Sequence, residues 1–322
     1  RFQRETGIRV RYDVYDSLEV LEAKLAAGRS GYDIVVPTDQ PTFARLVKNG
    51  ALRPIDRALV PNWANLDAGM MRQVEAADPG NRHGAIYLWG TIGLGVNFSR
   101  VAALSPDAPR DSLSLLFDPA QAQRVRGCGI VMMDSATDVI PTVLRYLGKD
   151  PNSTAADDLR AVERTLLAIR PYIRAFASGG VIEQLASGQA CVAFGYSGDV
   201  IQAAVRAAET GRGVKVEYVA GREGAQLWHD MLAIPADAPN ADNAHAFINF
   251  LLRPDVMAEI SNKTQYPNAA PASWPLIRPE VRNNPSIFPD EAARARFFTV
   301  GPVDATTDRA RSRMWARFKA GR

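Results

Sequence analysis

Two aromatic–acidic pairs in the sequence have the chemistry of a site for a positively charged ligand. Tyr196 and Asp199 stand in a short turn after an apolar run, and Trp228 and Asp230 flank a single residue. The face of an aromatic ring attracts a cation by roughly 0.5–2 kcal/mol, and a carboxylate adds a charge-assisted hydrogen bond. We therefore expect the two pairs to face one ligand-binding cleft.

These residues also have other interpretations. Asp199 precedes a predicted helix and would serve there as an N-cap, and a tryptophan in a strand, such as Trp228, is usually a core residue. The Gly-Tyr-Ser-Gly run at 195–198 shares part of the Gly-x-Ser-x-Gly motif of hydrolases, but its second glycine comes one residue too early. An α/β hydrolase that uses Ser197 stays open as a rival hypothesis.

Length and composition set the broad class of protein. A chain of 322 residues exceeds the size at which one core usually stops growing, which predicts two lobes. Apolar residues make up 47% and charged residues 23% of the chain, as in ordinary globular proteins. The formal charge of +3 is scattered, without the aromatic-basic interleaving that indicates nucleic-acid binding. No apolar stretch approaches the roughly 20 residues of a membrane span.

The two cysteines, Cys128 and Cys191, each stand at the start of an apolar run. From the residues alone, one disulfide and two buried free thiols are equally compatible with this placement. The cysteines and the three widely separated histidines lack metal-ligand spacing, so we expect no metal and no cofactor. The first residues are typical of the end of a helix with a C′ glycine at Gly7, and no signal peptide is present. We therefore expect the natural chain to begin before Arg1.

Alternating strands and helices must position these residues. Period-2 patterning predicts strands over 8–15 and 32–37, with a helix that begins at Ser17 between them. This alternation indicates an α/β architecture with parallel pairing, in which Thr38 and Asp39 stand at a strand end where a ligand binds. Further patterns predict strands at 85–89, 94–97, 129–133, 191–194 and 215–219, and helices at 138–147, 155–169, 181–186, 241–252 and 308–319.

Two stretches of the chain are predicted to be connections. Residues 90–93, Gly-Thr-Ile-Gly, are expected to link two short strands. With the glycine at 95 they have the order Gly-x-x-Gly-x-Gly, which differs from the dinucleotide-binding fingerprint, and no strand–loop–helix unit surrounds them. Residues 99–111 are rich in Pro, Asp and Ser, and they mark a candidate boundary between lobes.

Several runs of the chain resemble one family of proteins. They are residues 32–37, the Leu-Gly-Lys-Asp-Pro-Asn-Ser run at 147–153, residues 195–199, and the stretch from 237 to 269 with Arg-Pro-Asp at 253–255. Together they resemble the bacterial polyamine-binding proteins, which are the extracytoplasmic solute receptors of spermidine/putrescine ABC transporters. The resemblance extends over nearly the whole chain, and it is strong for the putrescine-binding branch.

The resemblance implies a type II periplasmic-binding-protein fold, in which two α/β lobes enclose the ligand in a cleft. We expect lobe one to comprise residues 1–99 and 230–274, and lobe two to comprise residues 100–229 and 275–322. The family's first strand and the signal peptide are expected to be missing from this chain, which would be periplasmic. The resemblance also implies that Cys128 and Cys191 form a disulfide.

The function that the resemblance implies is capture of a polyamine, foremost putrescine, and its delivery as a monomer to the membrane permease of an ABC transporter. No catalysis is expected. Asp199 and Asp230 match carboxylates that hold ligand amines, and Tyr196 and Trp228 match aromatic walls. The remaining matched ligand positions are Thr38, Asp134 and Tyr266. A receptor for another organic cation and a sensor-type polyamine receptor stay open as alternatives.

One departure from the family concerns Thr137, which stands where relatives commonly have a glutamate that binds an amine. Loss of that carboxylate removes a charge-assisted hydrogen bond of roughly 1.5–3 kcal/mol. Asp39 or Asp138 would have to compensate, but we expect Asp138 to point elsewhere on its helix.

Overall fold

The structure is a computed structural model that describes residues 1–15, 18–177, 180–211 and 213–322. Unit 1 comprises Arg1–Trp89 and Trp228–Arg282, and unit 2 comprises Gly90–Leu227 and Asn283–Arg322. These units divide after residues 89, 227 and 282, whereas the sequence suggested divisions after 99, 229 and 274. The predicted helix start at Ser17 lies outside the described residues.

Unit 1 packs short helices and extended segments around one apolar core that includes Phe43, Ile86, Met231 and Ile248. Gly7, at φ 74°, caps the first helix as predicted. The helices and helical turns of this unit are α1 (Phe2–Thr6), α2 (Leu18–Ala26), η1 (Asp39–Phe43), α3 (Ala44–Lys48), η2 (Arg57–Leu59), η3 (Pro61–Asn65), α4 (Ala68–Gln73), α12 (Ala241–Leu251), α13 (Pro254–Thr264), η6 (Pro271–Leu276) and α14 (Pro279–Arg282).

The segment that was predicted as a strand at 32–37 lies antiparallel to β6 (Gln226–Ala233). It forms two isolated bridges, Val35 with Ala233 and Thr38 with Asp230. Three backbone hydrogen bonds of 2.8–3.0 Å join residues 35–37 to residues 231–233. The expected parallel pairing is therefore wrong for this part of the chain.

The strand that was predicted at 8–15 does not form, and no strand among the described residues pairs with this segment. Ile8 and Val10 pack against the core of unit 1, but Tyr12 and Val14 are 89% and 71% exposed. The alternation of apolar residues in this segment therefore corresponds to core contact only at Ile8 and Val10, and not to membership of a sheet.

The predicted connection at 90–93 is also wrong, because one continuous strand, β1 (Gly84–Val96), runs through it. The glycines are needed for close packing. A Cβ at Gly93 would lie 2.4 Å from the carbonyl oxygen of Val219, and one at Gly95 would lie 2.7 Å from the Leu185 side chain. These glycines therefore let neighbouring segments approach the strand closely.

Four strands lie within unit 2: β2 (Ile130–Met133), β3 (Ala175–Ala177), β4 (Val192–Tyr196) and β5 (Glu217–Val219). Together with β1 they form a sheet in the order β3-β2-β4-β1-β5, and β6 also pairs with β1. The β2–β4 pair is parallel as predicted. Strand β3, which was not predicted from the sequence, is also parallel to β2, whereas β1 is antiparallel to β4 and β5.

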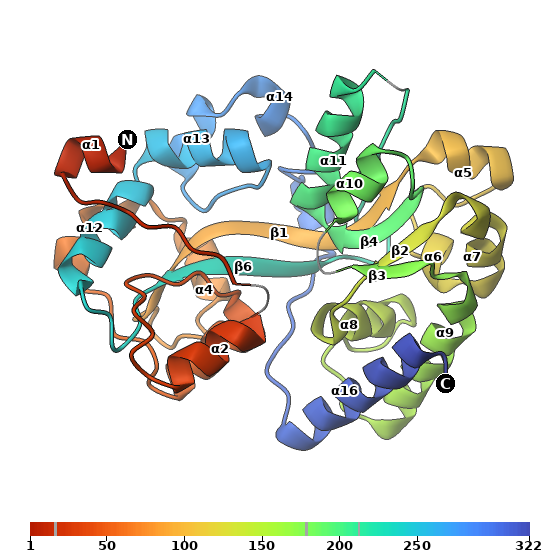
Figure 1. Ribbon diagram of the computed structural model, residues 1–322, viewed down its shortest axis with the longest axis horizontal. Helices are drawn as coiled ribbons and strands as arrows, with labels where there is room; N and C mark the ends of the chain where they lie inside the picture. Colours follow the sequence, from red (N-terminus) through yellow and green to blue (C-terminus); the bar gives the residue numbers. More distant parts are fainter. Residues whose placement is uncertain (16–17, 178–179, 212) are drawn as a thin grey trace. The chain divides into compact units, whose positions relative to one another are not determined.

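Helices cover both faces of this sheet in unit 2. Figure 1 shows α10 and α11 on one side and α8, α9 and α16 on the other. The helices and helical turns of the unit are α5 (Phe98–Leu104), α6 (Ser114–Phe117), α7 (Pro119–Val125), η4 (Arg126–Cys128), α8 (Ala136–Tyr146), α9 (Ala156–Ile169), η5 (Arg170–Tyr172), α10 (Val181–Ala186), α11 (Ser197–Glu209), α15 (Glu291–Arg294) and α16 (Ala305–Ala320). Both units thus combine helices with strands, which confirms the predicted α/β class.

The disulfide between Cys128 and Cys191 is present, with a Cα–Cα distance of 5.5 Å, and this prediction is confirmed. Cys128 lies just before β2 and Cys191 just before β4. Because β2 and β4 are parallel neighbours, the two cysteines meet at the same edge of the sheet. The bond therefore joins adjacent strands whose connection is 63 residues long.

Replacement of both cysteines, Cys128→Ser with Cys191→Ser, is expected to lower the free energy of unfolding by about 2–4 kcal/mol, since it frees the unfolded chain from a long closed loop. Urea unfolding followed by circular dichroism measures the change. The wild-type protein under reducing conditions is the control and should unfold at the midpoint of the double variant. Equal midpoints for oxidised wild type and double variant would contradict a stabilising bond.

Candidate functional site

Four of the predicted ligand residues come together in unit 1, and we call Thr38, Trp228, Asp230 and Tyr266 the Asp230 cluster. Thr38 pairs with Asp230 across the bridge to β6. Trp228 and Asp230 are two residues apart in β6, so the alternation of a strand directs both side chains to one face. The Trp228 ring, 7% exposed, meets the Tyr266 ring edge-on at 5.2 Å between centroids. The cluster therefore combines a carboxylate with an aromatic wall.

The electrostatics of this cluster favour a cation. Burial and the negative charge of Asp39 raise the pKa of Asp230 to about 8. Burial, together with the charge of Asp230, raises the pKa values of Tyr15 and Tyr87 to about 12. The charged side chain that shifts the pKa of Asp230 is thus another carboxylate. A positively charged ligand would stabilise the ionised form of Asp230.

Tyr15 and Tyr87 are site candidates that sequence reasoning missed. Both are half-buried, and the Tyr15 hydroxyl donates a hydrogen bond of 2.8 Å to the carbonyl of Val36. Tyr15 stands between Asp13 and Asp16, an aromatic–acidic signal that could have been used, whereas no acidic residue stands within five positions of Tyr87. Only the fold brings them within electrostatic reach of Asp230.

A second cluster lies in unit 2 around a carboxylate on α8, and we call Ser135, Asp138, Tyr196 and Gln226 the Asp138 cluster. The Tyr196 hydroxyl donates to Asp138 Oδ2 at 3.2 Å, and Gln226 Nε2 donates to Asp138 Oδ1 at 2.9 Å. The Ser135 hydroxyl donates to Asp138 Oδ2 at 2.6 Å. The expectation that Asp138 points elsewhere is therefore wrong.

The parallel strands explain why these residues meet. Strand β2 leads into α8, and β4 leads into α11, so the starts of both helices lie at one edge of the sheet. Gln226 had a usable signal in the sequence, because residues 226, 228 and 230 alternate along β6. Its Oε1 atom is buried and has no hydrogen-bond donor within the described part of the chain. A ligand N–H group would satisfy it.

Asp199 lies in the first turn of α11 and is half-buried. The N-cap position of this helix belongs to Tyr196 and not to Asp199. A carboxylate in the first turn still interacts favourably with the positive end of the helix dipole. Asp199 is therefore compatible with a ligand role, and the capping interpretation does not apply to it.

Asp134 has partners in the C-terminal helix α16. Its Oδ1 accepts a hydrogen bond of 2.8 Å from Trp315 Nε1, and its Oδ2 pairs with Lys319 Nζ at 2.9 Å. Burial opposes ionisation, but the bonds from Lys319 and Trp315 hold the pKa of Asp134 below its ordinary value. The nearby Thr137 is exposed, and its hydroxyl lies 3.0 Å from that of Ser135. Asp134 thus fastens α16 to the end of β2.

Ser197, the residue of the hydrolase hypothesis, is a structural residue at the start of α11. It is 2% exposed, and its hydroxyl accepts a hydrogen bond of 3.3 Å from the backbone N–H of Thr91. The two segments that form unit 2 contain no histidine to act as a general base. The geometry therefore gives this serine no activation.

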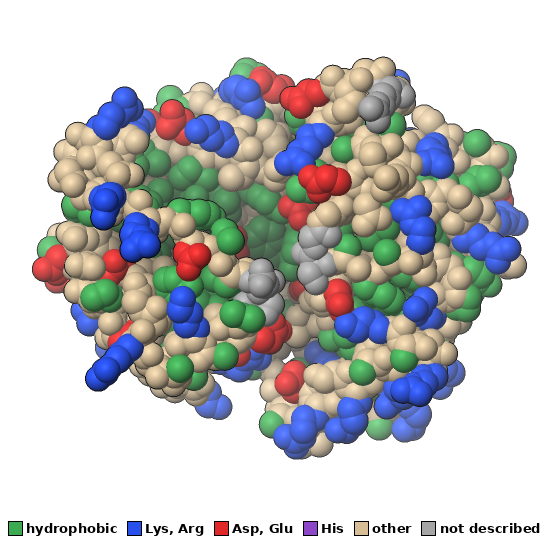
Figure 2. Space-filling view, in the orientation of Figure 1, with side chains coloured by type: hydrophobic (Ala, Val, Ile, Leu, Met, Phe, Trp, Pro, Cys, Tyr) green, Lys and Arg blue, Asp and Glu red, His purple; other side chains and the backbone are tan. Residues whose placement is uncertain are grey.

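The described residues contain no group of three His, Cys, Asp or Glu side chains that is arranged to hold a metal ion. Among the helices of the described chain, none has the length and apolar character needed to cross a membrane. Figure 2 shows acidic and basic side chains interspersed on the visible face, with basic groups gathered over α16.

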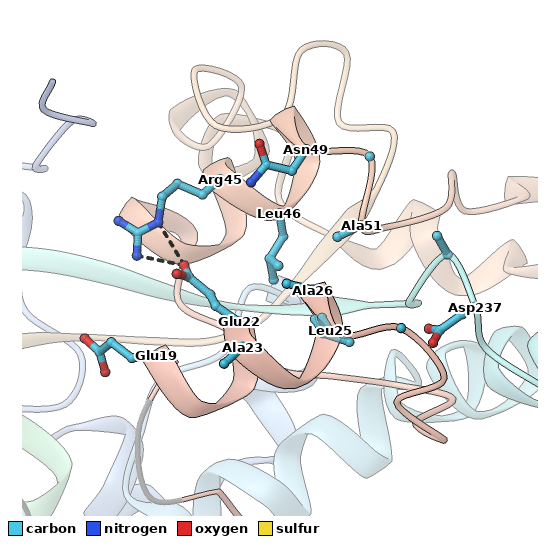
Figure 3. Close-up of a pocket in the computed structure, with 13 residues that line it drawn as sticks. Glu19, Glu22, Ala23, Leu25, Ala26, Arg45, Leu46, Asn49, Ala51 and Asp237 are labelled. Atoms are coloured by element: carbon cyan, nitrogen blue, oxygen red, sulfur yellow. Dashed lines mark hydrogen bonds and ion pairs between the residues drawn. The ribbon is translucent and has the colours of Figure 1, made fainter. Parts of the chain in front are cut away.

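A separate surface pocket of about 680 Å³ lies in unit 1 between α2 and α3 (Figure 3). Glu22 and Arg45 face each other across it in an ion pair of 2.7 Å. Asp237, on the opposite side, accepts a hydrogen bond of 2.8 Å from the backbone N–H of Ser30. Glu22 and Asp237 thus already have partners, and none of the described residues that line the pocket is aromatic, so the Asp230 cluster is the stronger candidate for binding a cation.

Comparisons with known proteins place the chain among binding proteins. The family model described as bacterial extracellular solute-binding protein matches residues 1–289. The putrescine-binding periplasmic protein SpuD of Pseudomonas aeruginosa is 46% identical, with 100% of this chain and 88% of the relative covered. The putrescine-binding periplasmic protein PotF of Escherichia coli is 45% identical, with coverage of 100% and 87%. The solved structure of a putative spermidine/putrescine ABC transporter from Listeria monocytogenes has a TM-score of 0.85 at 28% identity, with coverage of 100% and 94%.

Asp134→Ala is expected to lower the free energy of unfolding by about 1–3 kcal/mol, because the indole N–H of Trp315 loses its acceptor. A urea titration at pH 7 measures this loss. Since the pKa of Asp134 is depressed, its contribution is present at neutral pH and should disappear as the pH falls well below about 4. Thr137→Ala, in the same stretch but exposed, is the control and should change stability by less than about 0.5 kcal/mol. Equal effects of the two substitutions would contradict the anchoring role.

Proposed function

Since the chain belongs to the family of bacterial extracellular solute-binding proteins, we propose that it is a periplasmic receptor that captures a polyamine, foremost putrescine, for an ABC transporter. Two relatives at 45–46% identity are named as putrescine-binding periplasmic proteins, and this supports the choice of ligand. The predicted two-lobed type II fold is confirmed by the likeness to solved proteins of this kind. The members of this family are binding proteins, and we propose no catalysis.

The observation that carries the proposal is the Asp230 cluster. A buried ammonium group without a negative partner is prohibitively costly, so an amine receptor must supply carboxylates. Asp230 is such a carboxylate. Burial and the charge of Asp39 oppose its ionisation, and among the described residues the groups that shift its pKa include no protein cation. Trp228 and Tyr266 would pack against the methylene chain and add cation–π attraction.

Unit 2 offers the same chemistry in the Asp138 cluster. The three N–H bonds of an ammonium group need acceptors, and Asp138, the Tyr196 hydroxyl and the buried Oε1 of Gln226 are of the right kind. We propose that Asp138 and Asp199 bind an amine in this unit. Asp138 would then supply the carboxylate that is missing at Thr137. We propose no ligand contact for Asp134, whose oxygens serve α16.

The partner and the acting form belong to the same proposal. The relatives are named as periplasmic binding proteins, and solved proteins of this fold are named for spermidine/putrescine ABC transporters. We propose that a membrane permease receives the polyamine from this chain and that the chain acts as a monomer. Size-exclusion chromatography with light scattering tests the monomer with and without putrescine.

Asp230→Ala is expected to leave a folded protein that binds putrescine more than about tenfold more weakly, because a bound ammonium loses its charged partner. Calorimetric titration with putrescine, cadaverine, agmatine and spermidine measures the affinities. Asp242→Ala, an exposed carboxylate of α12 in the same unit, is the control and should bind as the wild type does. Absence of heat from any amine with the wild type would refute the polyamine proposal, and unchanged binding by Asp230→Ala would show that Asp230 is only structural.

Putrescine affinity is expected to rise with pH between 6 and 8. The raised pKa of about 8 means that Asp230 is mostly protonated at neutral pH, and it must release that proton to pair with an ammonium group. Alkylammonium groups stay charged in this range. Titrations in buffers of different ionisation enthalpy should show proton release that vanishes in Asp230→Ala. A flat pH profile for the wild type would contradict this coupling.

A further inference from the structure

A buried carboxylate–imidazole pair lies directly behind the Asp230 cluster. Asp39 is 5% exposed and His229 is fully buried. Asp39 Oδ1 accepts a hydrogen bond of 3.0 Å from the backbone N–H of His229, and Oδ2 lies 3.1 Å from His229 Nδ1. One carboxylate thus holds both the main chain and the side chain of the residue that separates Trp228 from Asp230.

The backbone pairing beside Asp39 shows which hydrogen bond its side chain replaces. Residues 35–38 run antiparallel to β6, and the last bridge joins Thr38 to Asp230. The chain then turns into η1 at Asp39, so no further backbone carbonyl of this segment pairs with the N–H of His229. The Asp39 side chain takes that N–H instead. The hydrogen-bonded contact between this segment and β6 therefore extends by one residue, to His229, which precedes Asp230 and follows Trp228.

Asp39 also acts on the cluster through its charge. The titratable groups coupled to Asp230 are Asp39 on η1, Tyr15 in the segment before α2, and Tyr87 on β1, with His229 next to it on β6. Of these, Asp39 is the second carboxylate. Its negative potential favours a nearby cation and disfavours ionisation of Asp230.

The imidazole of His229 is committed to this pair. Within the described chain its Nε2 atom is buried and makes no hydrogen bond, so its polar contact is the one through Nδ1 to Asp39. Because Asp39 accepts at Nδ1, the proton of a neutral imidazole resides on that nitrogen. The side chain of His229 is thereby held on the face of β6 opposite Trp228 and Asp230.

We propose that Asp39 is a positioning residue for cation binding, which orients Trp228 and Asp230 through His229 and adds a second negative charge felt by the bound ammonium group. This proposal rests on the proposed polyamine-binding function. It assigns Asp39 no direct contact with the ligand, and it separates two contributions: a mechanical one, carried by the bonds to His229, and an electrostatic one, carried by the charge.

The same unit contains a matched control. Asp78 is fully buried and accepts hydrogen bonds from the backbone N–H of His83 at 2.6 Å and of Gly84 at 3.2 Å, while its Oδ1 lies 2.8 Å from His83 Nδ1. The chemistry of the Asp39–His229 pair is therefore repeated at a place where the carboxylate does not contribute to the electrostatics of Asp230. Asp78→Asn reports the general cost of neutralising such a pair.

The experiment compares the wild type with Asp39→Asn, Asp78→Asn and His229→Asn. Calorimetric titration with putrescine from pH 6 to pH 9 gives the affinities, and carboxyl ¹³C NMR of the unliganded proteins follows the titration of Asp230. We expect Asp39→Asn to weaken binding at pH 9 about tenfold and to move the Asp230 midpoint to lower pH. His229→Asn keeps the charge of Asp39, so it should weaken binding without that shift. Asp78→Asn should bind within twofold of the wild type and leave the midpoint in place.

Two results would overturn the proposal. One is an unchanged Asp230 midpoint and affinity in Asp39→Asn, and the other is an equal loss of affinity in Asp39→Asn and Asp78→Asn with no shift of the midpoint in either. The NMR titration needs no ligand, so it judges the electrostatic role of Asp39 even if putrescine gives no heat. Absence of heat from the wild type would instead count against the proposed function.

Discussion

A carboxylate held away from water requires a positive partner, and this constraint governs unit 1. Burial and the charge of Asp39 both act against ionisation of Asp230. Tyr15 and Tyr87, whose pKa values the charge of Asp230 raises, and Trp228, two residues away on β6, bring no cation. At neutral pH a proton neutralises most of this carboxylate, and in the proposed function an ammonium group has to displace that proton. Under that proposal the cluster selects a ligand by its positive charge as well as by its contacts with the methylene chain.

In unit 2 the organising constraint is the parallel pairing of β2 with β4. Strands that run the same way bring their beginnings to one edge of a sheet and their ends to the other. The disulfide joins the beginnings, and the starts of α8 and α11 follow the ends. The hydrogen bond from Tyr196 to Asp138 is a result of this alignment. A covalent bond at one edge thereby supports the geometry of polar side chains at the other.

Much of the local structure follows from pattern, whereas the contacts between distant residues do not. Helix α10 has the bounds that its periodicity predicts, whereas the prediction of a turn that carries Tyr196 and Asp199 is wrong, because β4 extends to Tyr196 and α11 begins directly at Ser197. The strand expected at 8–15 fails because periodicity reports alternating apolar residues but not the presence of a neighbouring strand. The glycines at 90, 93 and 95 suggest a linker by propensity, yet Gly93 and Gly95 allow the close approach of Val219 and Leu185 to one long strand.

The contacts of Asp138 could not be read from its own helix. The helix was expected to begin at residue 138, but it begins at Ala136, so Thr137 and Asp138 both lie in its first turn and point about 100° apart. Which of the two meets Tyr196 and Gln226 depends on strands that are distant in sequence. By contrast, Trp228 and Asp230 were placed correctly relative to each other, because they belong to one strand, in which residues two apart share a face.

The division of each unit between two separate stretches of chain has a consequence for biosynthesis. Unit 1 needs residues from Trp228 onward to supply most of β6 and the helices α12 and α13, so its core cannot close while only the first 89 residues exist. Unit 2 in turn waits for α16, whose Trp315 and Lys319 fasten onto Asp134. A growing chain of this design stays without either finished core until late in translation, and contacts between residues so far apart in sequence form slowly. Such a topology delays completion of unit 1 until residue 282 has been made, and completion of unit 2 until α16 has been made.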